Sequence, residues 1–182
     1  MQPSRIHVTG ASGSGTTTLG RALAEHWSVP HADADDYLFV PTEPPYVQKR
    51  APASRVSLMR ELFAPKKAWV LSGSVMEWGE PIVAECDAVV FLTLGPRERL
   101  RRLEAREVRR RAGGDFDHAA WTEFVEWAAG YDDPAFAGRS RHAHDAWLDS
   151  LDQPVLSLDS EKSVQELRDA VLAWNPSPRV LR

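Results

Sequence analysis

The chain has 182 residues, with 22 Lys and Arg against 26 Asp and Glu, which gives a net charge of −4 at pH 7. That balance excludes an overall positive field that would draw the protein to nucleic acid, and no apolar run approaches the ~18 residues that span a membrane. A single cysteine, Cys86, excludes an internal disulfide, and the first residues lack the apolar stretch of a signal peptide, so the cytoplasm is the expected location.

Short apolar runs of strand length alternate along the chain with segments of helical character. In chain order we predict strands over residues 5–10, 29–32, 68–73, 88–94 and 154–159, each bounded by Gly, Pro or charged residues. Helices are predicted over residues 17–27, 54–64, 96–111, 118–129, 139–150 and 163–174. The alternation predicts an α/β fold with a central parallel sheet, in a single domain over residues 1–182 that is a monomer or a homodimer.

The first predicted strand runs into a glycine-rich turn, VTGASGSGTTTLG, from Val8 to Gly20. Gly10 and Gly15 have the spacing of the phosphate-binding loop G-x-x-x-x-G-K-[ST], and Thr17 falls where a hydroxyl coordinates magnesium. Glycines let backbone N–H groups turn inward around an anion, and the following helix adds its positive dipole end. The predicted nucleotide-binding residues are Gly10, Ala11, Ser12, Gly13, Ser14, Gly15, Thr16, Thr17 and Thr18.

Thr16 stands where the motif has its lysine. The loop therefore lacks the ammonium that neutralises the outer phosphates during phosphoryl transfer, and another cation must replace it. A glycine-rich turn between a strand and a helix that binds nothing is the alternative interpretation.

Carboxylates follow the second predicted strand in the stretch HADADDYLF. Asp33 and Asp35 point the same way if the segment is extended, and they lie at the sheet edge where open α/β sheets bind ligands. One of the two carboxylates is predicted to orient magnesium, usually through water, while the other accepts the proton of an attacking hydroxyl. The alternative is a helix cap, in which Asp35 or Asp36 only ends the strand.

Arginines recur at three- and four-residue spacing in the predicted helix over residues 96–111 and share one face: Arg99, Arg102, Arg106 and Arg109. Leu100, Leu103 and Val108 lie on another face and are predicted to pack in the core. Phosphates are natural partners of such a row, because guanidinium groups bind them with two parallel hydrogen bonds. A solvated face relieved by neighbouring glutamates is the alternative.

The aromatic residues and histidines are mostly expected in structural roles. Trp121, Phe124 and Trp127 follow a helical interval and are predicted to be core residues. His142 and His144 are expected on the surface, because no further ligand has the spacing of a metal site. Trp78 is the exception, since it follows the third strand at the end that faces the site, and Tyr46 is also placed to touch a substrate.

The order of these parts resembles that of the small P-loop kinases of the adenylate kinase, shikimate kinase and gluconate kinase group. The shared features are the phosphate loop, D-x-D after strand two, SGS after strand three and the arginine-rich helix after strand four. The resemblance implies a three-layer P-loop NTPase fold, with a five-stranded parallel sheet in the order 2-3-1-4-5. It also implies a substrate-binding excursion over residues 38–56, a lid over 109–120 and a peripheral tail over 175–182.

The same resemblance implies ATP and Mg²⁺ as ligands, with Thr17 and Asp33 holding the metal and Asp35 serving the acceptor hydroxyl. By similarity, Arg106, Arg109 or Arg110 correspond to lid arginines, and Arg139 or Arg141 to the arginine of the following helix in nucleotide kinases. The sequence departs from the group in two further places. SGS replaces the glycine triplet of shikimate kinases, and no arginine directly follows Asp35, which leaves the substrate contacts to Lys49, Arg50 and Arg55.

The leading functional prediction is ATP-dependent phosphoryl transfer to a small hydroxylated metabolite. A nucleoside monophosphate kinase is the alternative within the enzymes. A nucleotide-binding regulatory protein with a degenerate loop is the alternative from another class.

Overall fold

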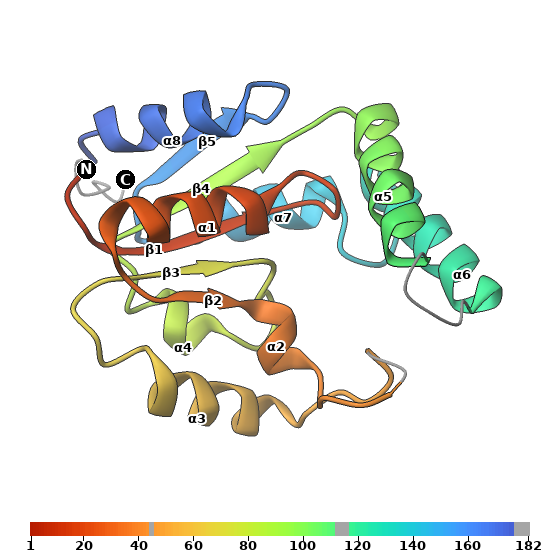
Figure 1. Ribbon diagram of the computed structural model, residues 1–182, viewed down its shortest axis with the longest axis horizontal. Coiled ribbons are helices and arrows are strands. Elements are labelled where there is room, and N and C mark those ends of the chain that lie inside the picture. The colour runs from red at the N-terminus through yellow and green to blue at the C-terminus, as the bar shows by residue number, and fades with distance from the viewer. Residues whose placement is uncertain (44–45, 112–116, 177–182) are drawn as a thin grey trace.

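Five short strands form the centre of the molecule in the computed structural model, which describes residues 1–43, 46–111 and 117–176 (Figure 1). They are β1 (Arg5–Gly10), β2 (His31–Asp33), β3 (Trp69–Ser72), β4 (Ala88–Thr93) and β5 (Val155–Asp159). All neighbouring pairs are parallel, and the order across the sheet is β2-β3-β1-β4-β5. This confirms the predicted α/β fold and strand order.

The helices are α1 (Thr16–Trp27), α2 (Ala34–Leu38), α3 (Pro52–Leu62), α4 (Glu80–Val83), α5 (Pro96–Arg111), α6 (His118–Ala129), α7 (Arg141–Asp149) and α8 (Val164–Ala173), with a 3₁₀ turn η1 (Gly130–Asp132). Helices α1 and α8 cover one face of the sheet, and α3, α4 and α7 cover the other, which gives three layers. Helices α5 and α6 extend beyond the sheet at its carboxyl edge (Figure 1). No helix formed by the described residues is long and apolar enough to cross a membrane.

Alternating residues of the inner strands enter two separate cores, as strands covered on both faces must. In β4, Val90 and Leu92 pack towards α1 and α8, whereas Val89 and Phe91 pack towards α3, α4 and α7. Cys86 belongs to the second core, where its thiol donates to the Ile82 carbonyl at 3.6 Å and burial raises its pKa. The near-continuous apolarity of these strands is therefore explained by burial on both sides.

Capping residues account for where the helices begin. The Asp33 carboxylate caps α2, Asp117 caps α6, Ser140 caps α7, and Ser163 forms a capping box with Glu166 at α8. Because Ser140 is the cap, α7 begins two residues later than predicted and Arg139 lies before the helix. Helices α2 and α4 were not predicted, and both are too short to show a hydrophobic period.

Three structural predictions about individual side chains were wrong. His144 is fully buried rather than on the surface, because α7 turns it towards the sheet. Val108, predicted to be core, has 65% of its surface exposed, since α5 has run past the edge of the sheet at that point. Trp121 and Phe124 are only half-buried and Trp127 is 37% exposed; they pack mainly against one another along α6.

The segments predicted around the core are placed in part. Within the excursion over 38–56, the chain turns back on itself, with an antiparallel bridge between Phe39 and Lys49 and a hydrogen bond from the Val40 N–H to the Gln48 carbonyl. Of the predicted lid over 109–120, residues 112–116 lie outside the described part, and 118–120 form the start of α6. Of the tail over 175–182, only Asn175 and Pro176 are described.

Candidate functional site

The glycine-rich loop between β1 and α1 has a backbone that side chains would prevent. Gly13 and Gly15 have φ angles of 85° and 94°, a region that residues with a Cβ rarely adopt. A Cβ on Gly10 would lie 2.6 Å from the Leu92 carbonyl oxygen, and one on Gly13 would lie 2.6 Å from the Arg99 carbonyl oxygen. Helix α1 then begins at Thr16, so its unpaired N–H groups and dipole are directed at the mouth of this loop.

Thr17 and Asp33 meet at the mouth of the loop. The Thr17 hydroxyl donates to Asp33 Oδ2 at 2.8 Å, and the Ser72 hydroxyl lies 3.5 Å from the same oxygen. The described residues contain no group of three or more His, Cys, Asp or Glu side chains arranged to hold a metal. Mg²⁺ needs fewer protein ligands than that, because it is held by one or two oxygen groups together with phosphates and water. A hydroxyl and a carboxylate in contact fit that requirement, so Thr17 and Asp33 would hold the ion.

Asp35 occupies the first turn of α2 and is not part of an extended segment, which corrects the predicted geometry. Asp33 caps this helix by accepting the Asp35 N–H at 3.2 Å, so the cap is formed by Asp33 and not by Asp35 or Asp36. Asp35 is exposed, but the protein around its carboxylate reduces its solvation and so raises its pKa. The negative charge of Asp33 raises the pKa further. Arg139 and Arg106 act in the opposite direction through their positive charges. The two carboxylates and the two arginines therefore share one electrostatic environment.

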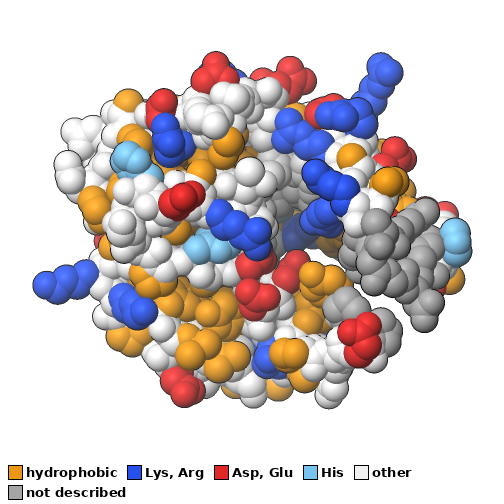
Figure 2. All heavy atoms as spheres, in the orientation of Figure 1, with side chains coloured by type: hydrophobic (Ala, Val, Ile, Leu, Met, Phe, Trp, Pro, Cys, Tyr) orange, Lys and Arg blue, Asp and Glu red, His pale blue; other side chains and the backbone are white. Residues whose placement is uncertain are grey.

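Basic and acidic side chains gather on opposite sides of the mouth of the phosphate loop. Figure 2 shows Lys and Arg side chains over the inner side of α5 and the start of α1, with carboxylates over the start of α2 directly below them. The predicted row of arginines on α5 contributes unequally to this arrangement. Arg106 and Arg109 are exposed, whereas Arg99 is fully buried and Arg102 is half-buried.

Arg99 and Arg102 support the loop from behind. Arg99 Nη1 donates to the Ser12 carbonyl at 3.4 Å and to the Ala128 carbonyl at 3.3 Å, and its Nη2 forms an ion pair with Asp132. Arg102 is paired with Glu98 and donates through Nη2 to the Ser160 carbonyl at 2.8 Å. These arginines have protein partners, which differs from the predicted row facing phosphates.

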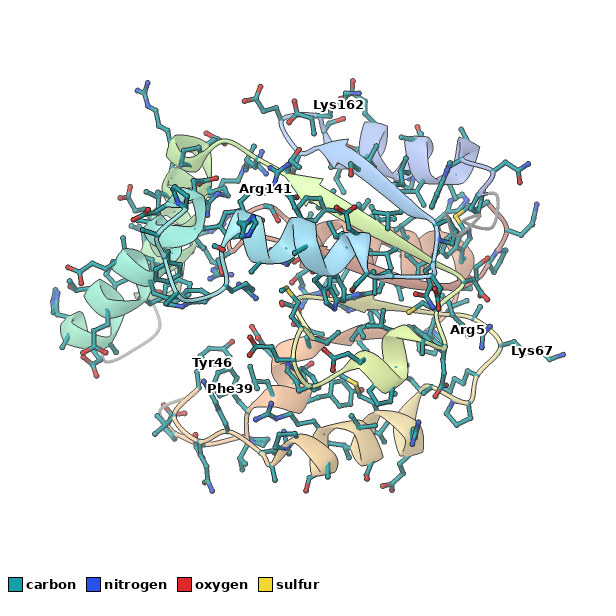
Figure 3. All side chains as sticks on the ribbon, turned by 180° about the vertical axis from the view of Figure 1, so that it is seen from behind. Arg5, Phe39, Tyr46, Lys67, Arg141 and Lys162 are labelled. Carbon is teal, nitrogen blue, oxygen red and sulfur yellow. The ribbon has the colours of Figure 1, made fainter. Side chains whose placement is uncertain are left out.

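Arg139 reaches the loop from the segment between η1 and α7. Its Nη2 donates to the Ser12 hydroxyl at 2.9 Å, and its guanidinium carbon lies 5.0 Å from the centre of the Trp127 ring. Arg141 behaves differently, because its Nε donates to both carboxylate oxygens of Asp145 at 2.9 and 3.0 Å and its guanidinium lies over Phe91. Only Arg139 of this pair joins the site; Figure 3 shows Arg141 at the start of α7.

Two of the residues predicted to bind substrate, Arg50 and Arg55, are hydrogen-bonded to backbone carbonyls. Arg50 Nη1 donates to the backbone carbonyls of Asp36, Tyr37 and Phe39. Arg55 Nε donates to the Arg50 carbonyl at 2.7 Å, and its guanidinium lies 5.2 Å from the Trp78 ring centre. Lys49 is exposed. Tyr46 packs edge-on against Phe39 at the tip of the excursion, where Figure 3 shows the two rings together.

Two groups of residues at the site were not predicted. Ser160, which follows β5, donates its hydroxyl to the Ser14 carbonyl at 2.5 Å. Its position after a strand end was the available signal, since all parallel strands end at the same edge. Beneath the loop, Thr9 Oγ1 lies 3.5 Å from His144 Nε2, and Tyr131 hydroxyl lies 3.0 Å from His144 Nδ1. No spacing in the sequence connects these three positions.

Comparisons with known proteins identify the family and the fold of the chain. Residues 6–121 match the family described as an AAA domain. Uncharacterized protein YqaC of Bacillus subtilis (strain 168) is 38% identical over 174 residues, covering 93% of this chain and 96% of that protein. A gluconokinase from Sinorhizobium meliloti 1021 superposes with a TM-score of 0.53 at 18% identity, covering 94% of this chain and 90% of its own. Shikimate kinase from Acinetobacter baumannii, in complex with shikimate, gives 0.53 at 17% identity, with 94% and 92% covered. The fold is therefore that of the small P-loop kinases.

Proposed function

The chain belongs to the AAA domain family, and from the geometry of its phosphate loop we propose that it transfers the terminal phosphate of ATP to a hydroxyl group of a small molecule. The observation that carries the proposal is the contact between Thr17 and Asp33 at the mouth of the loop. A phosphate cradle alone would serve a passive binder equally well. A hydroxyl and a carboxylate joined at that mouth are the protein ligands that Mg²⁺ requires for phosphoryl transfer.

Each part of the site has a role in that reaction. The backbone N–H groups from Gly13 to Thr17 and the start of α1 hold the phosphates. Magnesium, when bound, neutralises phosphate charge and orients the terminal group. Asp35 accepts the proton of the acceptor hydroxyl, whose oxygen bonds to the terminal phosphorus while the bond to the ADP oxygen breaks and ADP leaves with that electron pair. The raised pKa of Asp35 suits a group that must take up a proton.

The acceptor enters from the side of α2, where the carboxylates are open to solvent. Lys49, Arg50, Arg55 and Trp78 are proposed to contact it. Because Trp78 is covered by Arg55, we do not assign a nucleobase to this side and propose a hydroxylated metabolite as the acceptor class.

Titration calorimetry with a non-hydrolysable ATP analogue, with and without Mg²⁺, tests the nucleotide half of the proposal. We expect binding that strengthens at least ten-fold with Mg²⁺, and no binding under either condition would contradict the proposal. A panel of sugars, hydroxy acids and nucleoside monophosphates then tests the transfer step by ADP release. Strong analogue binding without ADP release from any acceptor would favour a regulatory nucleotide-binding protein.

Asp33→Asn tests the metal assignment without removing the cap of α2, because Asn caps helices as well as Asp does. We expect the Mg²⁺-dependent gain in analogue affinity to fall about ten-fold, since a neutral amide is a poorer magnesium ligand than a carboxylate. Asp36→Asn is the matched control, because this neighbouring carboxylate does not contact Thr17. An unchanged magnesium effect in Asp33→Asn would show that the assignment is wrong.

A further inference from the structure

The phosphate loop has a charge deficit that the proposed function must resolve. Thr16 is half-buried at the first position of α1, where the motif places a lysine. The transferred group carries negative charge that a cation must neutralise during the reaction. Among the described side chains, Arg99, Arg102 and Arg139 contact the loop or its immediate neighbours, so each can be considered as the replacement.

Arg99 and Arg102 are already bound to protein groups. Arg99 lies behind the loop with no exposed surface, and its charge is compensated by Asp132. Arg102 is compensated by Glu98 at 3.0 Å and holds the Ser160 carbonyl. Moving either guanidinium to a phosphate would break an ion pair and several hydrogen bonds.

Arg139 has no such compensation. Among the described residues it forms no ion pair, and the hydroxyl of Ser12 is its hydrogen-bond partner. Its Nε is buried and has no hydrogen-bond partner in the described part of the chain. Burial lowers the pKa of this half-buried arginine, and the negative charge of Asp35 acts in the opposite direction without forming an ion pair. A partly buried charge that forms no ion pair is costly, and an anion at the loop would lower that cost.

The surrounding side chains hold Arg139 at the loop. Its guanidinium stacks over Trp127, which in turn packs edge-on against Phe136. A Cβ on Gly138 would lie 2.6 Å from the Phe136 ring, so the chain passes this ring closely just before Arg139. The arginine is therefore positioned by the protein at the loop, where its Nη2 donates to a hydroxyl and not to a carboxylate.

We infer that Arg139 supplies the positive charge that the loop lacks at Thr16. When nucleotide binds, the Arg139 guanidinium exchanges its hydrogen bond with the Ser12 hydroxyl for contacts with the phosphates. This inference rests on the proposed function. It assigns to Arg139, which comes from a distant segment of the chain, the role that the motif gives to its lysine.

The inference predicts that positions 16 and 139 compensate for each other. In calorimetry with the magnesium complex of a non-hydrolysable ATP analogue, Arg139→Gln should weaken binding about ten- to a hundred-fold, the range for losing charged hydrogen bonds. Arg139→Lys should retain part of the affinity. Thr16→Lys should gain at least ten-fold in the Arg139→Gln background and less than three-fold in the wild type.

Arg141→Gln is the matched control. It removes the same charge only two residues from Arg139, but the guanidinium of Arg141 is paired with Asp145 and does not contact the loop. It should bind the analogue within two-fold of the wild type, and melting temperatures without nucleotide should show that all variants are folded. If Arg139→Gln melts early, Arg139→Lys takes its place as the background for Thr16→Lys. The gain in affinity should then stay below ten-fold, because position 139 keeps its charge, and a gain of ten-fold or more would overturn the inference.

The two possible failures are distinguishable. Absence of analogue binding in the wild type would contradict the proposed function and the inference with it. Wild-type binding with an unchanged Arg139→Gln variant, or an equal gain from Thr16→Lys in both backgrounds, would overturn the inference and leave the proposed function standing.

Discussion

Arginines hold the two segments that flank the phosphate loop in different ways. In the arm, defined as α5, α6 and η1, Arg99 of α5 joins α6 and η1 through Ala128 and Asp132, and it reaches the phosphate loop through the Ser12 carbonyl. Its guanidinium lies 4.8 Å from the Tyr131 ring centre. The acceptor-side segment, defined as residues 34–43 and 46–62, is anchored nearer the surface, where Arg50 binds three backbone carbonyls of its own segment.

This difference shows that the arginines around the site have two structural roles. In the arm, an arginine connects another element to the phosphate loop, so the position of the arm and the conformation of the loop are linked. On the acceptor side, the arginines stabilise local backbone and do not contact the loop. Loss of Arg99 should therefore change both stability and nucleotide binding, whereas loss of Arg50 should lower stability and leave nucleotide binding unchanged.

Arg99→Met gives the largest expected effect on this comparison. It leaves Asp132 and two carbonyl oxygens without their donor, and we expect the free energy of unfolding to fall by about 3 kcal/mol in urea denaturation. Affinity for the ATP analogue should also fall, because the Ser12 carbonyl loses its support. Arg101→Met is the control on the same helix, since this exposed side chain pairs only with Glu98 and should change stability by less than about 0.5 kcal/mol. Equal effects of the two variants would contradict a linked arm.

Acid should destabilise the fold through two buried histidines, His7 and His144, of which His144 contacts Tyr131 of the arm. Burial lowers the pKa of His144 to about 3 and that of His7 to about 4, against the ordinary value of 6.5. Between those values the unfolded chain binds protons that the folded chain does not, so the stability from these groups is complete above pH 6.5 and is lost as the pH falls. Each group contributes a slope of up to about 1.4 kcal/mol per pH unit.

In His144→Gln, the free energy of unfolding should depend less steeply on pH between pH 4.5 and 6. The slope should fall by about 1.4 kcal/mol per pH unit, which corresponds to one proton, and urea denaturation over a pH series measures it. His142→Gln is the matched control, because His142 is exposed on the same helix and should leave the slope unchanged. An identical slope in wild type and His144→Gln would show that His144 is not held neutral in the folded protein.

Arg50→Gln gives the smallest expected effect. Its hydrogen bonds lie near the surface, so we expect a loss of about 1 kcal/mol in the free energy of unfolding. Affinity for the ATP analogue should stay within two-fold of the wild type, as measured by calorimetry. A loss of nucleotide affinity as large as that of Arg99→Met would remove the distinction between the two segments.

The sheet was predictable from the sequence, because strands buried on both faces are apolar at nearly every position and the glycines mark their ends. The long helices were found within about two residues for the same reason, since their hydrophobic period and caps are local. Val108 and His144 were misassigned because burial at those positions depends on where α5 leaves the sheet and how α7 meets it. Neither property is encoded within one helix.

The candidate site was predictable where one short motif contains it. The loop from Gly10 to Thr17 and the carboxylate of Asp33 were identified from local spacing, and the structure brings Thr17 and Asp33 together. The division of labour among the arginines was not predictable, because Arg99 and Arg139 differ only in the partners that folding gives them. A row of like residues on a helical wheel does not reveal which member faces the loop.

The burial of Cys86 has a practical consequence for following motion at this site. The sequence contains one cysteine, and its thiol lies in the core with a raised pKa, so it is a poor target for maleimide reagents. A cysteine introduced at an exposed position of α6 and another on α3 would therefore be the reactive thiols of the native protein. A fluorophore pair attached there would report the distance between the arm and the acceptor side in single molecules, with the natural core left intact.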